Sequence, residues 1–132
     1  VLRCGGRVPA GRETGNFYEP TVITGMTPDM LLAREETFGP VAPFAPFTDL
    51  DRAIADANRS EYGLCGFVFT RDLSQAFRVA ERLEVGSVCI NNVAVNTPYA
   101  PYEGWKASGV GVELSSAAVG EYLHRKHLKL EV

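Results

Sequence analysis

Residues 64–91, with the sequence LCGFVFTRDLSQAFRVAERLEVGSVCIN, decide how this chain folds. The apolar runs at 64–69 and 87–91 each predict a short, largely buried strand. Between them, Asp72 is placed to cap a helix, with the glutamine of a capping box three positions later, and Gly86 follows the helix end. The apolar face of that helix is expected to consist of Leu73, Ala76, Phe77, Ala80 and Leu83. Strand, helix and strand with short connections predict a right-handed crossover between parallel strands.

The residues upstream repeat this pattern. The apolar run at 41–47 contains Pro43 and Pro46, which predicts an irregular or edge strand. Thr48 is expected to cap the next helix, with Asp51 as the acidic partner of a capping box. The apolar face of this helix is predicted to be Leu50, Ala53, Ile54 and Ala57. The chain is therefore expected to be an α/β protein with a mostly parallel sheet and crossover helices.

The composition is that of an ordinary globular domain. Of the 132 residues, 45% are apolar and 22% are charged, and 13 basic against 16 acidic residues give a net charge of −3. A slightly acidic chain is poorly suited to bind nucleic-acid backbones, and no apolar run approaches the ~20 residues that cross a bilayer. We therefore expect neither nucleic acid nor a membrane as a partner.

The thiols and imidazoles do not form a recognisable metal or disulfide pattern. Cys4, Cys65 and Cys89 are odd in number and widely spaced, and the last two lie in apolar runs, which predicts buried free thiols. His124 and His127 are interpreted as surface residues because no Asp, Glu or Cys completes a ligand set with them. The sequence therefore predicts no metal site and a reducing, cytoplasmic location.

Two segments near the C-terminus complete the expected organisation. Residues 92–113 form a long irregular segment with three aromatic side chains, which favours a functional loop over disorder. A helix is expected at 115–122. Residues 127–132 alternate polar and apolar side chains, which predicts a half-buried strand.

The strongest candidate for chemistry is the pair Glu36 and Phe38, which lies just before Gly39 and Pro40. The simplest interpretation of Glu35 and Glu36 is a solvated helix end. The functional interpretation is a carboxylate and a ring projecting from a stiff turn, which would suit a ligand with vicinal hydroxyls beside a flat ring. Neither a GxGxxG motif nor a Walker loop is present.

Residues 35–41, EETFGPV, resemble the EExFGPV motif of the NAD(P)-dependent aldehyde dehydrogenase superfamily. Five further segments resemble motifs of that family in the right order and at the right separations, which makes the match specific. These segments are 15–22 (GNFYEPTV), 58–64 (NRSEYGL), 68–72 (VFTRD), 86–91 (GSVCIN) and 101–111 (PYEGWKASGVG).

The resemblance implies roles for several residues. Glu36 would accept the hydroxyls of the nicotinamide ribose of NAD or NADP, and Phe38 would pack beside that ribose. Asn91 would close the strand below the active site, where a structural role is at least as well supported as a catalytic one. Asn96 and Tyr102 would face the substrate from the wall of the aldehyde tunnel.

This chain departs from the family pattern at two positions. Glu103 stands where the first glycine of a glycine pair is expected, and Val112 replaces an arginine that usually helps bind neighbouring elements or subunits. Both departures bear on the local loop geometry and on subunit contacts.

By the same resemblance, residues 1–123 correspond to the C-terminal part of the catalytic domain and 124–132 to an oligomerisation strand. The family's nucleophilic cysteine, general-base glutamate and dinucleotide-binding domain lie upstream of EExFGPV, and none of the three cysteines stands in the nucleophile's context. No catalytic residue is therefore assigned to this chain, which is expected to be inactive in isolation.

The implied function is the oxidation of a small-molecule aldehyde, with a semialdehyde among the candidates, to a carboxylic acid by a homo-oligomeric enzyme, either a dimer or a tetramer. Two alternatives remain open at this point. One is a stand-alone, non-catalytic chain that serves as a binding or assembly module. The other is an acylating enzyme that passes its thioester to coenzyme A.

Overall fold

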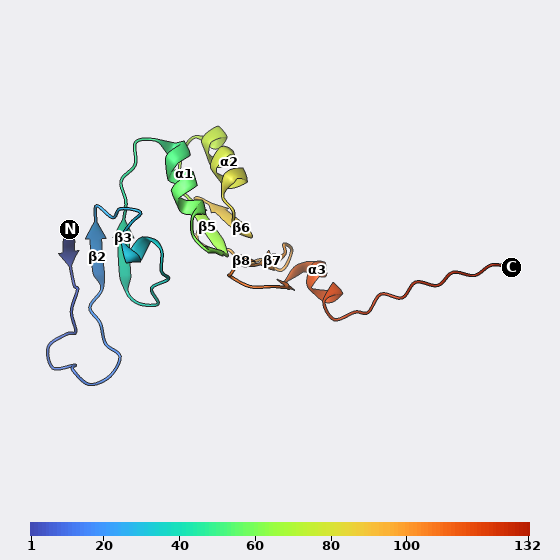
Figure 1. Ribbon diagram of the computed structural model, residues 1–132, viewed down its shortest axis with the longest axis horizontal. Helices are drawn as coiled ribbons and strands as arrows, with labels where there is room; N and C mark the ends of the chain where they lie inside the picture. Colours follow the sequence, from blue (N-terminus) through green and yellow to red (C-terminus); the bar gives the residue numbers. More distant parts are fainter. The chain divides into compact units, whose positions relative to one another are not determined.

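The computed structural model describes residues 1–132, which divide into two compact units, Val1–Ser60 and Glu61–Val132 (Figure 1). No helix in either is long and apolar enough to span a membrane.

The first unit is a three-stranded sheet followed by a helix. Its elements are β1 (Leu2–Cys4), β2 (Thr21–Thr24), the 3-10 helix η1 (Leu31–Ala33), β3 (Val41–Phe44) and α1 (Leu50–Asn58). β2 lies in the middle, antiparallel to β1 and parallel to β3, so β3 is an edge strand and tolerates Pro43 as expected. Thr21 is buried, and its hydroxyl accepts from Gly6 N at 2.8 Å and donates to Glu19 O at 2.7 Å. These bonds tie the start of β2 to the loop before it.

The start of α1 differs from the sequence prediction by one residue. Asp49, not Thr48, is the N-cap, and its carboxylate accepts from Asp51 N at 2.9 Å and Arg52 N at 3.2 Å. Both side chains can cap a helix, and the backbone turns into the helix only after Asp49. Of the predicted apolar face, Ile54 is buried and Ala57 is exposed.

The second unit contains the predicted crossover. Its elements are β4 (Tyr62–Gly63), β5 (Cys65–Val68), α2 (Leu73–Arg82), β6 (Ser87–Ile90), β7 (Tyr102–Glu103), β8 (Trp105–Lys106), β9 (Val112–Glu113) and α3 (Ser115–Gly120). β5 and β6 pair in parallel from Cys65↔Ser87 to Val68↔Ile90, with α2 between them in the chain. The β–α–β prediction is confirmed.

The cap of α2 is confirmed, and its predicted apolar face is confirmed in part. Asp72 accepts from Gln75 N at 3.0 Å. Of the predicted face, Ala76 is buried, and Ala80 and Leu83 are half-buried, whereas Leu73 and Phe77 are 67% and 53% exposed. Val79, which was not predicted, is buried as well.

The α/β class is confirmed, and the parallel ladders are β2–β3 and β5–β6. The segment predicted as an irregular loop, 92–113, contains three two-residue strands: β7 pairs antiparallel with β9, and β8 with β4. Residues 123–132 form neither helix nor strand, and their apolar side chains are exposed. The pairing predicted for residues 127–132 therefore remains a prediction about a segment outside this chain.

Candidate functional site

The loop that carries Glu36 and Phe38 is pinned at both ends. At its start, Glu35 N donates to Leu31 O in η1 at 2.8 Å. At its end, Gly39 N donates to Thr37 O at 3.0 Å, and the Pro40 carbonyl accepts from Thr21 N in β2 at 2.7 Å. The backbone around these two residues is therefore held between a helical turn and the sheet.

Within this fixed loop, the two side chains predicted to bind the cofactor are free. Glu36 is exposed, and its carboxylate makes no hydrogen bond or ion pair. The ring of Phe38 is 95% exposed. Burying such a side chain is worth about 1.5–3 kcal/mol, so a bare ring on a tight loop is a favourable contact surface for a flat ligand. A ring and an unpaired carboxylate two residues apart can together bind a ribose and its attached base.

Tyr102, predicted to contact substrate, lies half-buried in β7 of the second unit. Its hydroxyl is 3.4 Å from the sulfur of Cys65, and either group can donate the hydrogen bond. This bond raises the pKa of the Tyr102 phenol above its ordinary value, and partial burial and the negative charge of Glu113 add to the effect. The contact therefore stabilises the protonated form of the phenol.

Asn96, the other predicted substrate residue, is exposed in the segment between β6 and β7. The start of this segment is folded back by Asn92, whose side-chain oxygen accepts from Val93 N at 2.7 Å and Ala94 N at 3.0 Å. Cys89 donates its thiol to Ala94 O at 3.5 Å. The Asn96 amide has no protein partner, so both its donor and its acceptor are available to a ligand.

Asn91 has a structural role. With a φ of 53°, it turns the chain at the end of β6. Its side-chain oxygen accepts from Thr70 N at 2.9 Å, and its amide donates to Thr70 O at 2.8 Å. This paired bond ties the end of β6 to the turn that precedes α2, and it occupies both ends of the amide.

The motif at 101–111 is a structural clamp, in which glycines allow close backbone contacts. A Cβ on Gly86 would lie 1.8 Å from Glu103 O, and one on Gly104 would lie 2.8 Å from the Ser108 carbonyl carbon. Ser108 accepts from Gly63 N at 2.9 Å, which helps hold β8 against β4.

Glu103, which replaces the first glycine of the family's pair, is accommodated in this motif without loss of the close backbone contacts. Its carboxylate accepts from the indole Nε1 of Trp105 at 3.2 Å, and its backbone pairs with Val112 across β7 and β9. The glycine that the close contact requires is Gly104, and that glycine is present.

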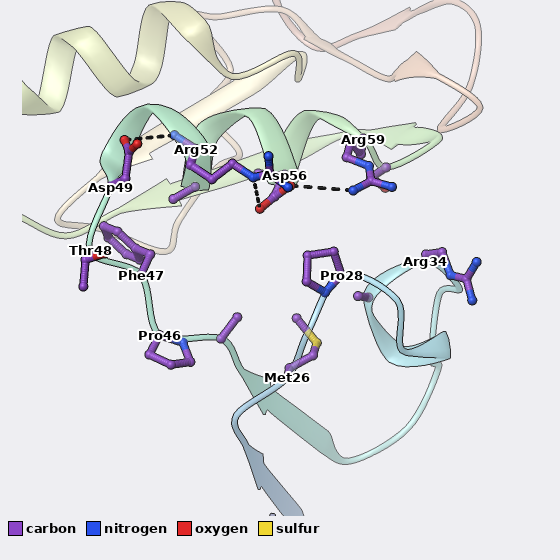
Figure 2. Close-up of a pocket in the computed structure, with 15 residues that line it drawn as sticks. Met26, Pro28, Arg34, Pro46, Phe47, Thr48, Asp49, Arg52, Asp56 and Arg59 are labelled. Carbon is purple, nitrogen blue, oxygen red and sulfur yellow. Dashed lines mark hydrogen bonds and ion pairs between the residues drawn. The ribbon is translucent and has the colours of Figure 1, made fainter.

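Sequence reasoning missed a groove of about 740 Å³ in the first unit, between α1 and the segments around η1 and β3 (Figure 2). Apolar side chains such as Met26, Pro46 and Phe47 line part of it. Its charged groups are already engaged: Asp56 pairs with Arg52 at 3.0 Å and with Arg59 at 3.8 Å, as Figure 2 shows. These charged side chains therefore bind one another and do not converge on a ligand.

The cysteines are free, but they are less buried than predicted. Cys4 is exposed, and Cys65 and Cys89, for which burial was predicted, are half-buried. No three His, Cys, Asp or Glu side chains gather into a set that could hold a metal ion.

Comparison with known proteins places these elements in a family. The chain matches the aldehyde dehydrogenase family over residues 1–128. It is 45% identical over 114 residues to the mitochondrial succinate-semialdehyde dehydrogenase of Rattus norvegicus, which covers 86% of this chain and 22% of that protein. Its identity to the NADP(+) succinate-semialdehyde dehydrogenase of Escherichia coli is 42% over 125 residues, 95% of this chain and 26% of that one.

The solved structures agree. Betaine aldehyde dehydrogenase from Staphylococcus aureus, crystallised in complex with NAD+, matches with a TM-score of 0.89 at 42% identity, over 97% of this chain and 26% of that one. The chain therefore belongs to the aldehyde dehydrogenase family. It spans about a quarter of the length of these relatives.

Proposed function

We propose that these 132 residues form the C-terminal part of an NAD- or NADP-dependent aldehyde dehydrogenase subunit that oxidises an aldehyde to a carboxylic acid. In this assignment, residues 1–123 belong to the catalytic domain and 124–132 to an oligomerisation strand. The observation that carries the proposal is the free Glu36–Phe38 pair on a pinned loop, within a chain of this family.

The first contribution of this chain is to orient the cofactor. The unpaired carboxylate of Glu36 accepts both hydroxyls of the nicotinamide ribose, and the bare ring of Phe38 packs beside that ribose. NAD(P), when bound, accepts the hydride that leaves the aldehyde carbon. Because η1 and β2 already hold the backbone of this loop, binding the ribose requires only the two side chains to become ordered.

The second contribution is the wall of the aldehyde tunnel, for which we propose Asn96 and Tyr102. The free amide of Asn96 suits a substrate with a polar group away from its aldehyde. Relatives named for succinate semialdehyde and betaine aldehyde act on aldehydes with a charged group at the far end. A semialdehyde is therefore the substrate class we favour.

The exposed surface of the chain supports its completion by further polypeptide, against the stand-alone alternative. Its accessible surface is 10,550 Å², whereas about 6,800 Å² is expected for one compact chain of this mass and roughly 8,200 Å² for two independent halves. The buried apolar side chains are only Ile54, Val68, Ala76 and Val79. So small a core favours a chain that packs against the rest of a subunit.

The tail supports a homo-oligomeric enzyme, a dimer or a tetramer. Leu128, Leu130 and Val132 are exposed and have no strand partner within the chain. Apolar side chains on an unpaired terminal segment favour association with another sheet edge. Deleting residues 127–132 from the complete enzyme is expected to lower its mass in solution, and an unchanged oligomer would contradict this assignment.

The free thiols support a reducing location, and we propose the cytoplasm.

The experiment that tests the activity uses the complete protein that contains this chain. NAD(P)H formation at 340 nm is expected with semialdehydes and without coenzyme A. Absence of turnover with every aldehyde and both cofactors would contradict the proposal. Turnover only with coenzyme A would instead identify the acylating alternative.

A further inference from the structure

The contact between Cys65 and Tyr102 joins two parts of the second unit that differ in how extensively their backbones are paired. Cys65 is the first residue of β5, and its strand is held along four residue pairs by β6. Tyr102 lies in the two-residue strand β7, paired only with β9, at the end of the segment that follows β6. Within the 3.4 Å contact, Cys65 is therefore the fixed partner and Tyr102 the adjustable one.

The contact also determines which part of the Tyr102 side chain remains available to a ligand. The phenol has one polar atom, and that atom is engaged by the Cys65 sulfur. A tyrosine side chain that is anchored on the sheet at one end and by its hydroxyl at the other has a fixed χ1, so the direction and position of its ring are set. The edge and face of the ring are then the surface that Tyr102 offers to a ligand.

We propose that Cys65 is a positioning residue, which holds the Tyr102 ring in the orientation that shapes the aldehyde tunnel. This inference rests on the proposed function, since it takes Tyr102 as part of the tunnel wall. Cys65 acts through Tyr102 and does not touch the substrate.

The test is a double-mutant cycle in the complete enzyme, with Cys65→Ala, Tyr102→Phe and the double variant. Each single change removes the hydrogen bond and should raise the aldehyde KM about three- to tenfold, the size of one neutral hydrogen bond. The kcat and the KM for NAD(P) should stay within about twofold, because the ring is only misoriented. The double variant should match the single ones, since both remove the same bond.

Two further variants distinguish a positioning role of Cys65 from a nonspecific loss of structure. Cys65→Ser replaces the thiol with a hydroxyl that can also bond to the phenol, so its aldehyde KM should stay close to that of the unmodified enzyme. Cys4→Ala removes an exposed thiol in the other unit and should change nothing. In addition, Cys65→Ala should lower the pKa of the Tyr102 phenol toward its ordinary value, as read by ultraviolet titration against Tyr102→Phe.

The possible failures are distinguishable. If the unmodified enzyme oxidises aldehydes and Cys65→Ala leaves the aldehyde KM unchanged, the positioning role is wrong and the proposed function stands. Losses that multiply in the double variant would likewise overturn the positioning role. If the unmodified enzyme oxidises no aldehyde, the proposed function and this inference both fall.

Discussion

Two regions of the molecule differ in whether their side chains have partners within the chain. One is the crossover formed by β5, α2 and β6, and the other is the loop that carries Glu36 and Phe38. In the crossover, polar groups are hydrogen-bonded to other groups of the crossover. These bonds are the β5–β6 pairing, the Asp72 cap of α2 and the two hydrogen bonds between Asn91 and Thr70. In the loop, only the backbone is satisfied, and the side chains point away without partners. Local sequence specifies most of such a scaffold, whereas in the loop around Glu36 and Phe38 only the backbone is held by the rest of the chain.

The largest effect on stability is expected from a substitution at Gly86, which precedes β6 in the crossover. A Cβ there would lie 1.8 Å from Glu103 O, which is backbone and cannot move away alone. Gly86→Ala should cost about 3 kcal/mol or more of unfolding free energy, or prevent soluble expression. Thermal unfolding of the complete protein measures it. Gly120→Ala is the control, since nothing lies within 4 Å of its Cβ, and a similar loss in both variants would contradict the close contact.

The next largest effect belongs to the loop. Glu36→Gln keeps the shape but removes the charge that strengthens the ribose hydrogen bonds, worth about 1.5–3 kcal/mol, or roughly ten- to a hundredfold in kcat/KM for the cofactor. The melting temperature should not fall, because the carboxylate has no partner to lose. Glu35→Gln, also exposed and one residue away, serves as the control. Equal kinetics for the two variants would make Glu36 an ordinary surface carboxylate.

A smaller effect tests the helix cap that the sequence misplaced. Asp49→Ala should destabilise the protein by about 1 kcal/mol, since two backbone amides lose their acceptor. Thr48→Ala should cost much less because its hydroxyl caps nothing. Urea unfolding of the two variants compares them, and a larger loss at Thr48 would refute the observed cap.

The smallest effect is expected at Asn96, whose amide has no protein partner. Asn96→Ala should leave stability unchanged and lower kcat/KM by a few-fold for aldehydes with a distant polar group, about one neutral hydrogen bond. Plain aliphatic aldehydes of similar length should be unaffected. An equal change for both substrate classes would remove Asn96 from the substrate wall.

The sequence predicted what depends on short-range pattern. The β5–α2–β6 crossover and the Asp72 cap follow from periodicity and one capping residue, and both are present. The choice between Thr48 and Asp49 could not be made, because either side chain can cap and only the backbone turn decides. The strands β7, β8 and β9 were missed because two-residue pairings carry no periodicity.

The cofactor and substrate residues remain a prediction that rests on resemblance, whereas some of the contacts around them could not be predicted from the sequence. Glu36 and Phe38 belong to one short motif, so their common loop was foreseeable. The bond between Cys65 and Tyr102 joins residues 37 positions apart, and neither flanking sequence signals the other. Such a contact depends on how the segment after β6 returns to the sheet, which local sequence does not encode.

The proposal that these residues belong to a larger catalytic subunit is tested most directly by the intact mass of the natural protein. Mass spectrometry of the enzyme purified from its source should give about four times the 14.4 kDa of this chain, with residues 1–132 contained within it. A natural protein of 14.4 kDa, whether it oxidised aldehydes by itself or bound a separate partner, would contradict the account.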